Sequence, residues 1–434
     1  MNVLVIGTGY VGLVSGTCFA ELGSNVTCVD KDLKKINSLK AGEIPIYENG
    51  LESLVKKNSD SGRLAFSSDV EGGIKEADII FIAVGTPPAQ DGGADLSHVM
   101  KVAEIIAENA KNGAIIVTKS TVPVGTGDKI NTLISNIKPD IQFSVASNPE
   151  FLREGNAVKD FLEPDRVVIG AQDEETLKKV ARLYKPLENE GRAIVLTDRR
   201  TAELSKYASN SYLAMRIAYI NEIADLCESC GADIEKVSEA MGFDHRIGGN
   251  YLKPGPGFGG SCFPKDTLAL RKIGNDHDVE LKITDAVINS NNDRKLKLVD
   301  KIISAAGGEI SGKKISVLGL AFKANTDDIR DSSALTVIEK LLEHNAEISA
   351  YDPEALENTK KFFSNDKIRY ENSTYDCCRD AEIIIILTEW NEFQNIDWHQ
   401  VNPAKDKIII DFRNLYNPAS MRDKGFKYHS VGRV

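Results

Sequence analysis

The chain has 434 residues and a formal net charge of −11, with 42% hydrophobic and 27% charged residues. One hydrophobic core rarely grows beyond roughly 300 residues, so the length predicts two or three domains. The acidic balance argues against a nucleic-acid or anionic-membrane partner, although a local basic pocket for phosphates is compatible with it. Apolar runs such as Ile383–Leu387 have the length of a strand and are far too short to span a bilayer.

The cysteines and the N-terminus favour a reducing compartment. A strand pattern begins at Val3, which leaves no room for a signal peptide. Seven cysteines without framework spacing are typical of a protein that keeps its thiols reduced. Cys227 and Cys230 form a lone CxxC with no second pair to complete a zinc site, and six scattered histidines offer no metal constellation. We therefore expect a cytoplasmic protein with no structural or catalytic metal.

Strand and helix patterns alternate in the first part of the chain, which is typical of a parallel sheet with helices on both faces. From about Asp198 the pattern becomes helical, and long helices are predicted over 201–230 and 278–306. The alternation restarts at Gly312. The predicted strands are Val3–Ile6, Asn25–Asp30, Ile79–Val84, Ala114–Lys119 and Gln142–Ser147, then Lys314–Gly319, Glu347–Tyr351, Glu382–Leu387 and Lys407–Asp411.

A dinucleotide-binding fingerprint follows the first predicted strand. Gly7-Thr-Gly-Tyr-Val-Gly12 leads directly into an apolar helix pattern. Its three glycines let a pyrophosphate approach the backbone at a helix N-terminus, whose free N–H groups and dipole favour anions. Asp30, at the end of the second strand, would bind ribose hydroxyls and repel a 2′-phosphate. NAD is therefore favoured over NADP, a preference that Lys31 and Lys35 soften slightly.

Three more segments follow predicted strands, where the ligands of doubly wound sheets bind. They are Val84-Gly-Thr-Pro-Pro88, Lys119-Ser-Thr-Val-Pro123 and Asn148-Pro-Glu-Phe-Leu-Arg-Glu154. The first two could be plain turns in which proline sets φ. In the third, Glu150 and Glu154 are four residues apart and could share one solvated helix face.

Two features of the helical middle part carry chemistry. Lys206 and Asn210 share one face of a predicted helix, and a cation and an amide projecting together can hold an oxyanion in a dry site. Alone, Lys206 would be interpreted as a surface lysine. Further on, Gly255-Pro-Gly-Phe-Gly-Gly-Ser-Cys-Phe-Pro-Lys-Asp266 places one cysteine behind a run of glycines. Cys262 is either a small space-filler or a nucleophile, and its charged and glycine neighbours favour the nucleophile.

In their order along the chain, these motifs resemble those of the UDP-glucose/GDP-mannose dehydrogenase family. The resemblance runs from Gly7 to at least Arg413 and rests on GTGYVG, KSTVPVGT, NPEFLREG, the helix with Lys206 and Asn210, GFGGSCFPKD, GLAFKANTDDIRDS and LTEW. It implies a two-step, four-electron oxidation of a sugar primary alcohol to a carboxylate, with two NAD molecules used in turn. The segments Pro164–Gly170 and Leu387–Trp390 favour the branch that acts on UDP-glucose.

The resemblance also implies a role for each candidate residue. Cys262 would form a thiohemiacetal and then a thioester, and a helix starting near Pro264 would favour its thiolate. Lys206 and Asn210 would stabilise the oxyanion. The other implied catalytic residues are Asp266, which positions a water and takes part in proton removal, Glu150, the general base in thioester hydrolysis, and Thr121, which holds water.

The implied ligand contacts fall into two sets. The cofactor contacts are Gly7, Gly9, Tyr10, Val11, Gly12, Asp30, Lys35, Thr86, Thr121, Glu154, Lys265 and Arg330. The substrate contacts are Phe151, Leu152, Lys206, Asn210, Arg246, Tyr251, Gly255, Phe258, Gly259, Lys323 and Arg413. Arg246 resembles a residue that reaches substrate across a dimer interface.

We therefore expect an α/β fold with two Rossmann-like, doubly wound parallel-sheet domains joined by a central helical domain. The expected parts are an NAD-binding domain (1–197), a helical domain that forms a homodimer (198–310) and a UDP-sugar-binding domain (311–434). The last part has Gly319-Leu-Ala-Phe322 in place of GxGxxG, so it is not a second NAD site. Phe412 stands where many family members have glycine, so the shape of the loop at Arg413 is not defined by the resemblance.

Four alternative functions differ in what they require. A GDP-mannose 6-dehydrogenase shares the cysteine loop. UDP-N-acetylmannosamine dehydrogenases usually carry histidine beside this cysteine, whereas its neighbours here are Ser261 and Phe263. A 3-hydroxyacid dehydrogenase would share the first domain and a central lysine, but it would need neither Cys262 nor a third domain. A non-catalytic NAD-sensing protein would have no need of Lys206, Cys262 and Asp266 together.

Overall fold

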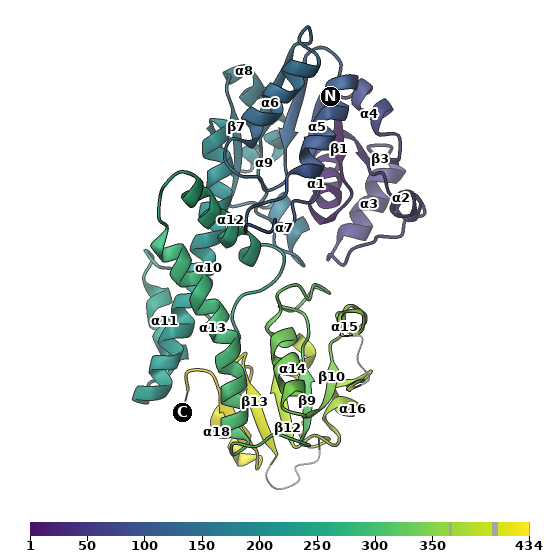
Figure 1. Ribbon diagram of the computed structural model, residues 1–434. Helices are drawn as coiled ribbons and strands as arrows, with labels where there is room; N and C mark the ends of the chain where they lie inside the picture. The colour runs from purple at the N-terminus through teal and green to yellow at the C-terminus, as the bar shows by residue number, and fades with distance from the viewer. Residues whose placement is uncertain (364–366, 402–406, 434) are drawn as a thin grey trace. The chain divides into compact units, whose positions relative to one another are not determined.

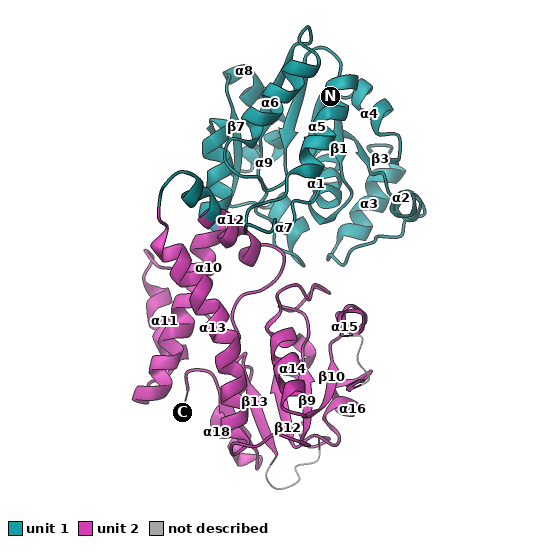
Figure 2. Ribbon diagram, viewed as in Figure 1, with its two compact units in different colours: residues 1–209, 272–279 teal, residues 210–271, 280–434 magenta. Residues whose placement is uncertain are grey.

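The computed structural model describes residues 1–363, 367–401 and 407–433. The chain divides into two compact units, shown in teal and magenta in Figure 2. Unit 1 comprises residues 1–209 and 272–279, and unit 2 comprises residues 210–271 and 280–434. Each unit contains one β-sheet (Figure 1).

The sheet of unit 1 has the strand order β3-β2-β1-β4-β5-β6-β7-β8. The first six strands are parallel in the order of a Rossmann fold. Strand β7 is antiparallel to β6 and parallel to β8, so the last two strands run against the others. The bounds are β1 Asn2–Ile6, β2 Asn25–Val29, β3 Leu64–Ser67, β4 Ile79–Ile82, β5 Ala114–Thr118, β6 Phe143–Ser147, β7 Arg166–Ala171 and β8 Ala193–Thr197.

Helices cover both faces of this sheet. Every residue of β4 and β5 is buried, because strands between two helical layers bury both of their faces. One core includes Phe19 of α1 and the other includes Ile106 of α5 and Ile130 of α6. The helices are α1 Tyr10–Glu21, α2 Leu33–Lys40, α3 Leu51–Asp60, α4 Val70–Glu76, α5 Ser97–Asn109, α6 Thr126–Ile137, α7 Ala157–Leu162, α8 Glu174–Ala181, η1 Arg182–Tyr184 and α9 Lys185–Asn189.

Four helices follow in the chain (Figure 1): α10 Arg199–Cys230, α11 Ile234–Phe243, α12 Phe263–Asp276 and α13 Lys282–Ala305. The predicted long helices are confirmed, with α13 beginning four residues later than expected. The reason is local, because Asp278 has φ 55°, which a right-handed helix cannot contain. Helix α12 begins at Phe263. Pro264 is tolerated in its first turn, because proline has no N–H and an N–H at this position would have no helical acceptor.

Unit 2 contains a six-stranded sheet of order β11-β10-β9-β12-β13-β14, in which all neighbours are parallel. This is again the Rossmann order. Its core continues from the four isoleucines of β12 into α13 and α14. The bounds are β9 Lys314–Leu318, α14 Ser333–Glu343, β10 Glu347–Tyr351, α15 Leu356–Phe362, β11 Ile368–Tyr370, α16 Thr374–Cys378, β12 Ile383–Ile386, α17 Asn391–Gln394, β13 Ile408–Asp411, α18 Pro418–Asp423 and β14 Lys427–Ser430.

The predicted fold class is confirmed: two Rossmann-like sheets are joined through a helical middle part. The strands without a sequence prediction are β3, β7, β8, β11 and β14. All but β7 lie at a sheet edge, and in β8 Val195 and Leu196 are exposed. No helix among the residues described combines the length and the apolar character that a membrane span requires. The expected boundaries at 197 and 310 stay a prediction.

Helix α10 fixes the turn that leads from β5 into α6. The buried Glu203 carboxylate accepts hydrogen bonds from the backbone N–H groups of Gly125 at 2.6 Å and Gly127 at 2.8 Å, at the N-terminus of α6. One turn earlier, the buried Arg199 forms an ion pair with Asp128 of α6. The first turns of α10 therefore act as a cap on another helix.

We expect Glu203 to make the stability of the protein depend on pH. Burial raises the pKa of this carboxyl from 4.5 to about 7, although the Gly125 and Gly127 N–H groups oppose the shift. Between these pH values the folded chain holds a proton that the unfolded chain releases. The contribution of Glu203 to stability therefore falls by about 3 kcal/mol as the pH rises from 4.5 to 7, and is constant above that range.

Denaturant unfolding of wild type and Glu203→Gln at pH 5 and pH 8 measures this fall. The variant cannot titrate at this position, so its unfolding free energy should decline less between the two pH values. Glu108→Gln, at an exposed position of α5, is the matched control. An equal decline in wild type and Glu203→Gln would contradict the prediction.

Candidate active site

The glycine turn between β1 and α1 has the shape that a pyrophosphate requires. A Cβ at Gly12 would lie 1.9 Å from the Gly7 carbonyl oxygen, and Gly7 itself has φ 104°. Around Gly9, by contrast, a Cβ would meet nothing within 4 Å. Two glycines are thus required by packing and one faces open space. Helix α1 begins at Tyr10, and the N–H groups of its first turn have no helical acceptors.

Asp30 lies beside this turn, directly after β2. Its carboxylate accepts hydrogen bonds from the N–H and the hydroxyl of Thr8, each at 2.9 Å, and from the N–H of Asp32 at 3.0 Å. Burial alone would raise the pKa of Asp30, but these bonds and the charge of Lys35 hold it below the ordinary value. An ionised carboxylate next to an open glycine turn fits NAD, which these residues would hold by pyrophosphate and ribose.

Tyr10 connects the glycine turn to a distant segment. Its hydroxyl donates a hydrogen bond to Glu48, and the N–H of Gly155 reaches both the Tyr10 hydroxyl and the Glu48 carboxylate at 2.8 Å. Glu154, a predicted cofactor contact, belongs to the turn held in this way. Glu48 had no sequence prediction, because its partners Tyr10 and Gly155 are far from it in the chain and no local motif indicates them.

The turns after β4 and β5 are tied to each other. The Thr86 hydroxyl donates to the carbonyl of Thr121 at 3.0 Å, and the Ser120 hydroxyl donates to the carbonyl of Val84 at 2.6 Å. The structure therefore brings together Thr86 and Thr121, two predicted site residues that are far apart in sequence. Both lie at the carboxyl edge of the sheet, where ligands of such folds bind.

Glu150 and Lys206 form a buried ion pair. The Lys206 ammonium lies 2.9 Å from the Glu150 carboxylate, which also accepts the N–H of Leu152 at 2.6 Å. Burial would raise the pKa of Glu150, but the charge and hydrogen bond of Lys206 hold it below the ordinary value. The Phe151 ring lies 5.3 Å from this ammonium and 3.5 Å from the Arg166 guanidinium.

Two alternatives from the sequence are wrong. Lys206 is only 2% exposed, so it is no surface lysine. Residues 148–153 are not helical, so Glu150 and Glu154 share no helix face. The segment after β6 instead adopts an irregular conformation in which Glu150 is buried.

In unit 2, three predicted residues form a second polar cluster. The buried Asp266 carboxylate accepts a hydrogen bond from the Asn210 amide at 2.6 Å, and on its other oxygen it pairs with the Lys265 ammonium. Asp266 is in the first turn of α12, and Asn210 is in α10. A fully buried carboxylate with an amide and a cation as partners is held in one orientation.

Cys262 immediately precedes α12. Its carbonyl accepts the N–H of Asp266 at 2.8 Å, and its sulfur lies 3.5 Å from the Ser261 hydroxyl. The residue is partly exposed, whereas burial raises the pKa of five other thiols, those of Cys18, Cys28, Cys227, Cys377 and Cys378. A thiol at a helix N-terminus is favoured in its thiolate form. All seven cysteines are described and none is in a disulfide.

Buried polar side chains from two helices hold the glycine-rich loop before Cys262. Asn291 of α13 accepts the N–H of Phe258 at 2.8 Å and donates to its carbonyl at 3.0 Å. Arg294 donates to the carbonyl of Gly255 at 3.1 Å, and Asn221 of α10 accepts the N–H of the same glycine at 2.8 Å. These three residues had no sequence prediction. Their only signal is their place on the buried faces of two helices.

Two glycines of this loop are required by packing. A Cβ at Gly259 would lie 2.4 Å from the Asp331 carbonyl oxygen, and one at Gly260 would lie within 2.8 Å of the Phe322 ring. The Gly260 N–H also donates to the Arg330 carbonyl at 2.7 Å. The loop that carries Cys262 is therefore seated against the loop that follows β9.

Arg413 connects three strand ends of the second sheet. Its guanidinium donates to the carbonyls of Leu387 and Phe322, each at 2.8 Å, and forms an ion pair with Glu389 at 2.9 Å. Phe412, the departure from the family pattern, is fully buried in the core. The loop after it is well defined, because the Asp411 carboxylate accepts the N–H groups of residues 413, 415 and 416.

Asp352 holds a loop of the second sheet by accepting backbone N–H groups, as Asp30 does in the first sheet. It follows β10 and its carboxylate accepts the N–H groups of Leu320 and Ala321 at 2.7 and 3.0 Å, and the indole N–H of Trp390 at 3.0 Å. This aspartate fixes the loop of Gly319, which begins the GLAFKANTDDIRDS motif and has no GxGxxG pattern. Lys323 follows in the same loop, with its ammonium 5.5 Å from the Phe322 ring.

The remaining predicted residues divide into two groups. Tyr251 and Phe258 lie in or next to the glycine-rich loop, each with its ring 6.1 Å from that of Phe263. Arg246 and Arg330 have largely exposed side chains, each paired with an aspartate two residues earlier in the chain. Their predicted ligand contacts are therefore not part of the clusters described above.

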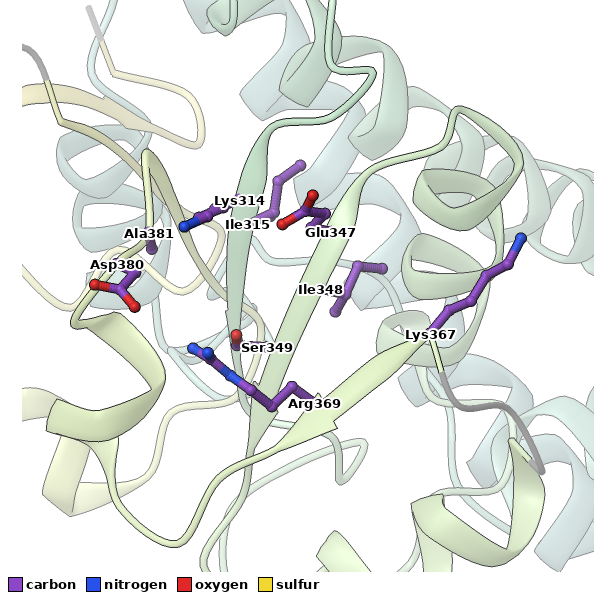
Figure 3. Close-up of a pocket in the computed structure, with 9 residues that line it drawn as sticks. All are labelled: Lys314, Ile315, Glu347, Ile348, Ser349, Lys367, Arg369, Asp380 and Ala381. Carbon is purple, nitrogen blue, oxygen red and sulfur yellow. The ribbon is translucent and has the colours of Figure 1, made fainter.

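A cavity of about 280 Å³ in unit 2 lies elsewhere. It is lined at the amino ends of β9 and β10 by Lys314 and Glu347, opposite to the edge where ligands of such sheets bind (Figure 3). Lys367 points away from the other charged groups, and Arg369 pairs with Glu371 at 2.5 Å. In the described part of the chain, no three His, Cys, Asp or Glu side chains are grouped to hold a metal ion.

Comparisons with known proteins agree with this geometry along the whole chain. Three domain models of the UDP-glucose/GDP-mannose dehydrogenase family match this chain. They are the NAD binding domain at residues 1–188, the central domain at 200–293 and the UDP binding domain at 316–418. A UDP-glucose 6-dehydrogenase of Rhizobium meliloti is 47% identical over 437 residues, covering 100% of both chains.

Solved structures are similar as well. A UDP-glucose dehydrogenase from Pyrobaculum islandicum superposes with a TM-score of 0.91 at 38% identity, covering 100% of this chain and 98% of its own. A UDP-N-acetylmannosamine dehydrogenase from Pyrococcus horikoshii reaches 0.87 at 28% identity, covering 100% and 99%. The matched NAD binding domain confirms the predicted cofactor. The chain belongs to the UDP-glucose/GDP-mannose dehydrogenase family, as the order of its motifs predicted.

Proposed function

We propose that this chain oxidises the C6 alcohol of UDP-glucose to the carboxylate of UDP-glucuronate, with two NAD molecules and one water consumed. The observation that carries the proposal is the setting of Cys262. It is partly exposed at the N-terminus of α12, one turn from the buried cluster of Asp266, Asn210 and Lys265. A space-filling cysteine would need no such surroundings.

The choice of UDP-glucose rests on sequence similarity. Dehydrogenases of different sugar nucleotides share this fold, since the Pyrococcus horikoshii structure is named for UDP-N-acetylmannosamine at a TM-score of 0.87. Identity is higher, 47% and 38%, to the two relatives named for UDP-glucose. The UDP part would lie on the second sheet, where Lys323 and Arg413 offer cations that pair with phosphate oxygens. The same similarity disfavours the alternative substrate GDP-mannose.

The glycine turn and Asp30 would hold NAD, which would supply the hydride acceptor for each of the two oxidations. The chain supplies the covalent handle that the second oxidation needs. The Cys262 thiolate attacks the aldehyde carbon, and the C–S bond gives a thiohemiacetal that can be oxidised to a thioester. Lys206 and Asn210 stabilise the oxyanion, while Asp266 holds a water and takes part in proton removal.

Glu150 would act as the general base when water cleaves the thioester. Its carboxylate is ionised, because Lys206 holds its pKa low, and one oxygen is fixed by the Leu152 N–H. Thr121 would hold the water. As Glu150 takes a proton from this water, the water oxygen forms a C–O bond to the thioester carbon. The C–S bond then breaks, which returns Cys262 as a thiolate.

The assembly that we propose is a homodimer formed through the helical domain, in a cytoplasmic enzyme whose product serves polysaccharide synthesis. Tyr212, Tyr219 and Leu226 of α10 are spaced by seven residues and are 56%, 48% and 58% exposed. Such an apolar stripe on one side of a long helix supports pairing with a second copy. The proposed domains are 1–197, 198–310 and 311–434.

Replacing Cys262 tests the covalent mechanism. Cys262→Ala should fold and bind both ligands, but lose the four-electron oxidation by about 10³-fold or more, because no thioester can form. Cys262→Ser should be similarly impaired. The measurement is NADH formed per mole of UDP-glucose, with GDP-mannose and UDP-N-acetylmannosamine as competing substrates. Cys230→Ala, at an exposed cysteine, is the control. Two NADH per sugar at nearly normal rate in Cys262→Ala would exclude the mechanism.

Replacing Glu150 tests the hydrolytic step. Glu150→Gln keeps the shape and an oxygen for Lys206, but it cannot accept a proton, so hydrolysis should slow about 10²- to 10⁴-fold. The expected trace is a rapid NADH burst and then a slow steady state, with sugar retained on the protein in intact-mass spectra. Glu188→Gln, at an exposed position, controls for the loss of charge. If no covalent adduct accumulates, Glu150 is not the base.

Charged substitutions on the α10 stripe test the dimer. Tyr219→Asp together with Leu226→Asp should convert a dimer into a monomer, because two carboxylates would be desolvated in the interface. Sedimentation or light scattering gives the mass directly. Leu33→Asp, at an exposed leucine of α2, is the matched control. A wild-type monomer, or a double variant that remains dimeric, would refute the proposed interface.

A further inference from the structure

A buried lysine lies next to the Glu150 site without a role in the mechanism above. Lys119 directly follows β5 and is only 4% exposed. Its ammonium donates to the Asn148 amide oxygen at 2.9 Å and to the Tyr184 hydroxyl at 3.1 Å. The rings of Phe161 and Tyr184 lie 5.6 and 5.7 Å from the nitrogen. Lysine is almost never fully buried unless it is paired, and these hydrogen-bond partners are neutral.

Lys119 is connected to Glu150 through Asn148, which lies two residues before Glu150 in the chain. Asn148 begins the Asn-Pro-Glu turn, and its own N–H donates to the Thr118 carbonyl at 2.9 Å. Its amide group donates to the Val168 carbonyl at 2.7 Å on one side and accepts from Lys119 on the other. The lysine therefore orients the side chain that anchors the turn two residues before Glu150.

The charge of Lys119 also acts on Glu150. It is one of the two cations, with Lys206, that lower the pKa of the Glu150 carboxyl. Burial lowers the pKa of Lys119 itself to about 7, with Glu150 opposing the shift and Lys206 adding to it. The amine is thus charged in acid, where Glu150 would take up a proton.

The other titratable groups around the amine are silent in this range. Burial raises the pKa of the Cys18 thiol of α1 and of the Tyr184 hydroxyl, so both stay protonated and neutral. The groups that change or carry charge here are therefore Lys119, Lys206 and Glu150.

We infer that Lys119 is a positioning residue for the hydrolytic base: its amine fixes the Asn148 turn, and its positive charge keeps Glu150 ionised below neutral pH. The inference rests on the proposed role of Glu150. A lysine that served only to fill the space between two aromatic rings would affect stability, whereas this one also sets the pH range in which the thioester is hydrolysed.

The experiment measures thioester hydrolysis in single turnovers from pH 3.5 to 8, by quenched samples and intact mass, so that the acid limb set by Glu150 lies within the range. Lys119→Met removes charge and hydrogen bonds, while Lys119→Gln keeps a donor for Asn148 and removes only the charge. In both, the acid limb of the profile should move up by about 1 pH unit, because one of two cations near Glu150 is lost. Tyr184→Phe is the comparison variant, since it removes the hydrogen bonds of this hydroxyl to the amine and to the Asn148 amide oxygen and leaves the charge of Lys119 in place.

The outcomes separate this inference from the proposed function. If Glu150→Gln slows hydrolysis while both neutral Lys119 variants keep the wild-type acid limb, the role of Lys119 is refuted and that of Glu150 stands. If Glu150→Gln hydrolyses the thioester normally, both fail together. A shift of the limb in Tyr184→Phe equal to that in Lys119→Gln would show that hydrogen bonding matters and the charge does not, which also overturns the inference.

Discussion

The buried ion pair of Glu150 and Lys206 is the constraint on which the carboxyl edge of the sheet of unit 1 depends. Two charges taken out of water cost several kcal/mol each, and their attraction offsets this only in good geometry. The 2.9 Å contact and the Leu152 N–H supply that geometry. Removing one partner from such a pair typically costs about 3–5 kcal/mol, because the other charge stays buried and uncompensated. The carboxylate of Glu150, the proposed base, is therefore held rigidly at some cost in stability.

Helix α10 carries Lys206 and three other buried polar side chains that hold neighbouring segments. Arg199, Glu203, Lys206 and Asn210 recur every three or four residues, so they lie along one side of the helix. Each of these side chains is itself buried and has a polar partner: the first two hold α6, the third holds Glu150 and the fourth holds Asp266. A polar stripe of this kind normally faces solvent. Here it is buried, and the side of α10 that carries Tyr219 is exposed instead.

The burial of the polar side of α10 illustrates what the sequence could and could not predict. The glycine turn and Asp30 were predictable, because a local pattern of strand, glycines and helix determines their geometry. Cys262 and Asp266 needed the family resemblance. Asn221, Asn291 and Arg294, which hold the glycine-rich loop, were not predicted from the sequence. A polar residue in a helix has the same local sequence pattern whether it faces water or a backbone loop. The helix-face interpretation of Glu150 failed for a related reason, since periodicity alone cannot tell a helix from an irregular buried segment.

The loop before Cys262 shows why such residues matter to chemistry. From Gly255 to Ser261 the backbone has no regular secondary structure, so its N–H and C=O groups depend on other partners. Asn291 and Arg294 satisfy two of its residues, and the close approach of Gly260 to Phe322 leaves the loop no room to relax. The loop is thereby ordered before any ligand arrives. If Cys262 is the nucleophile that we propose, the entropy of positioning its thiol is lost once in folding and not again in each catalytic cycle.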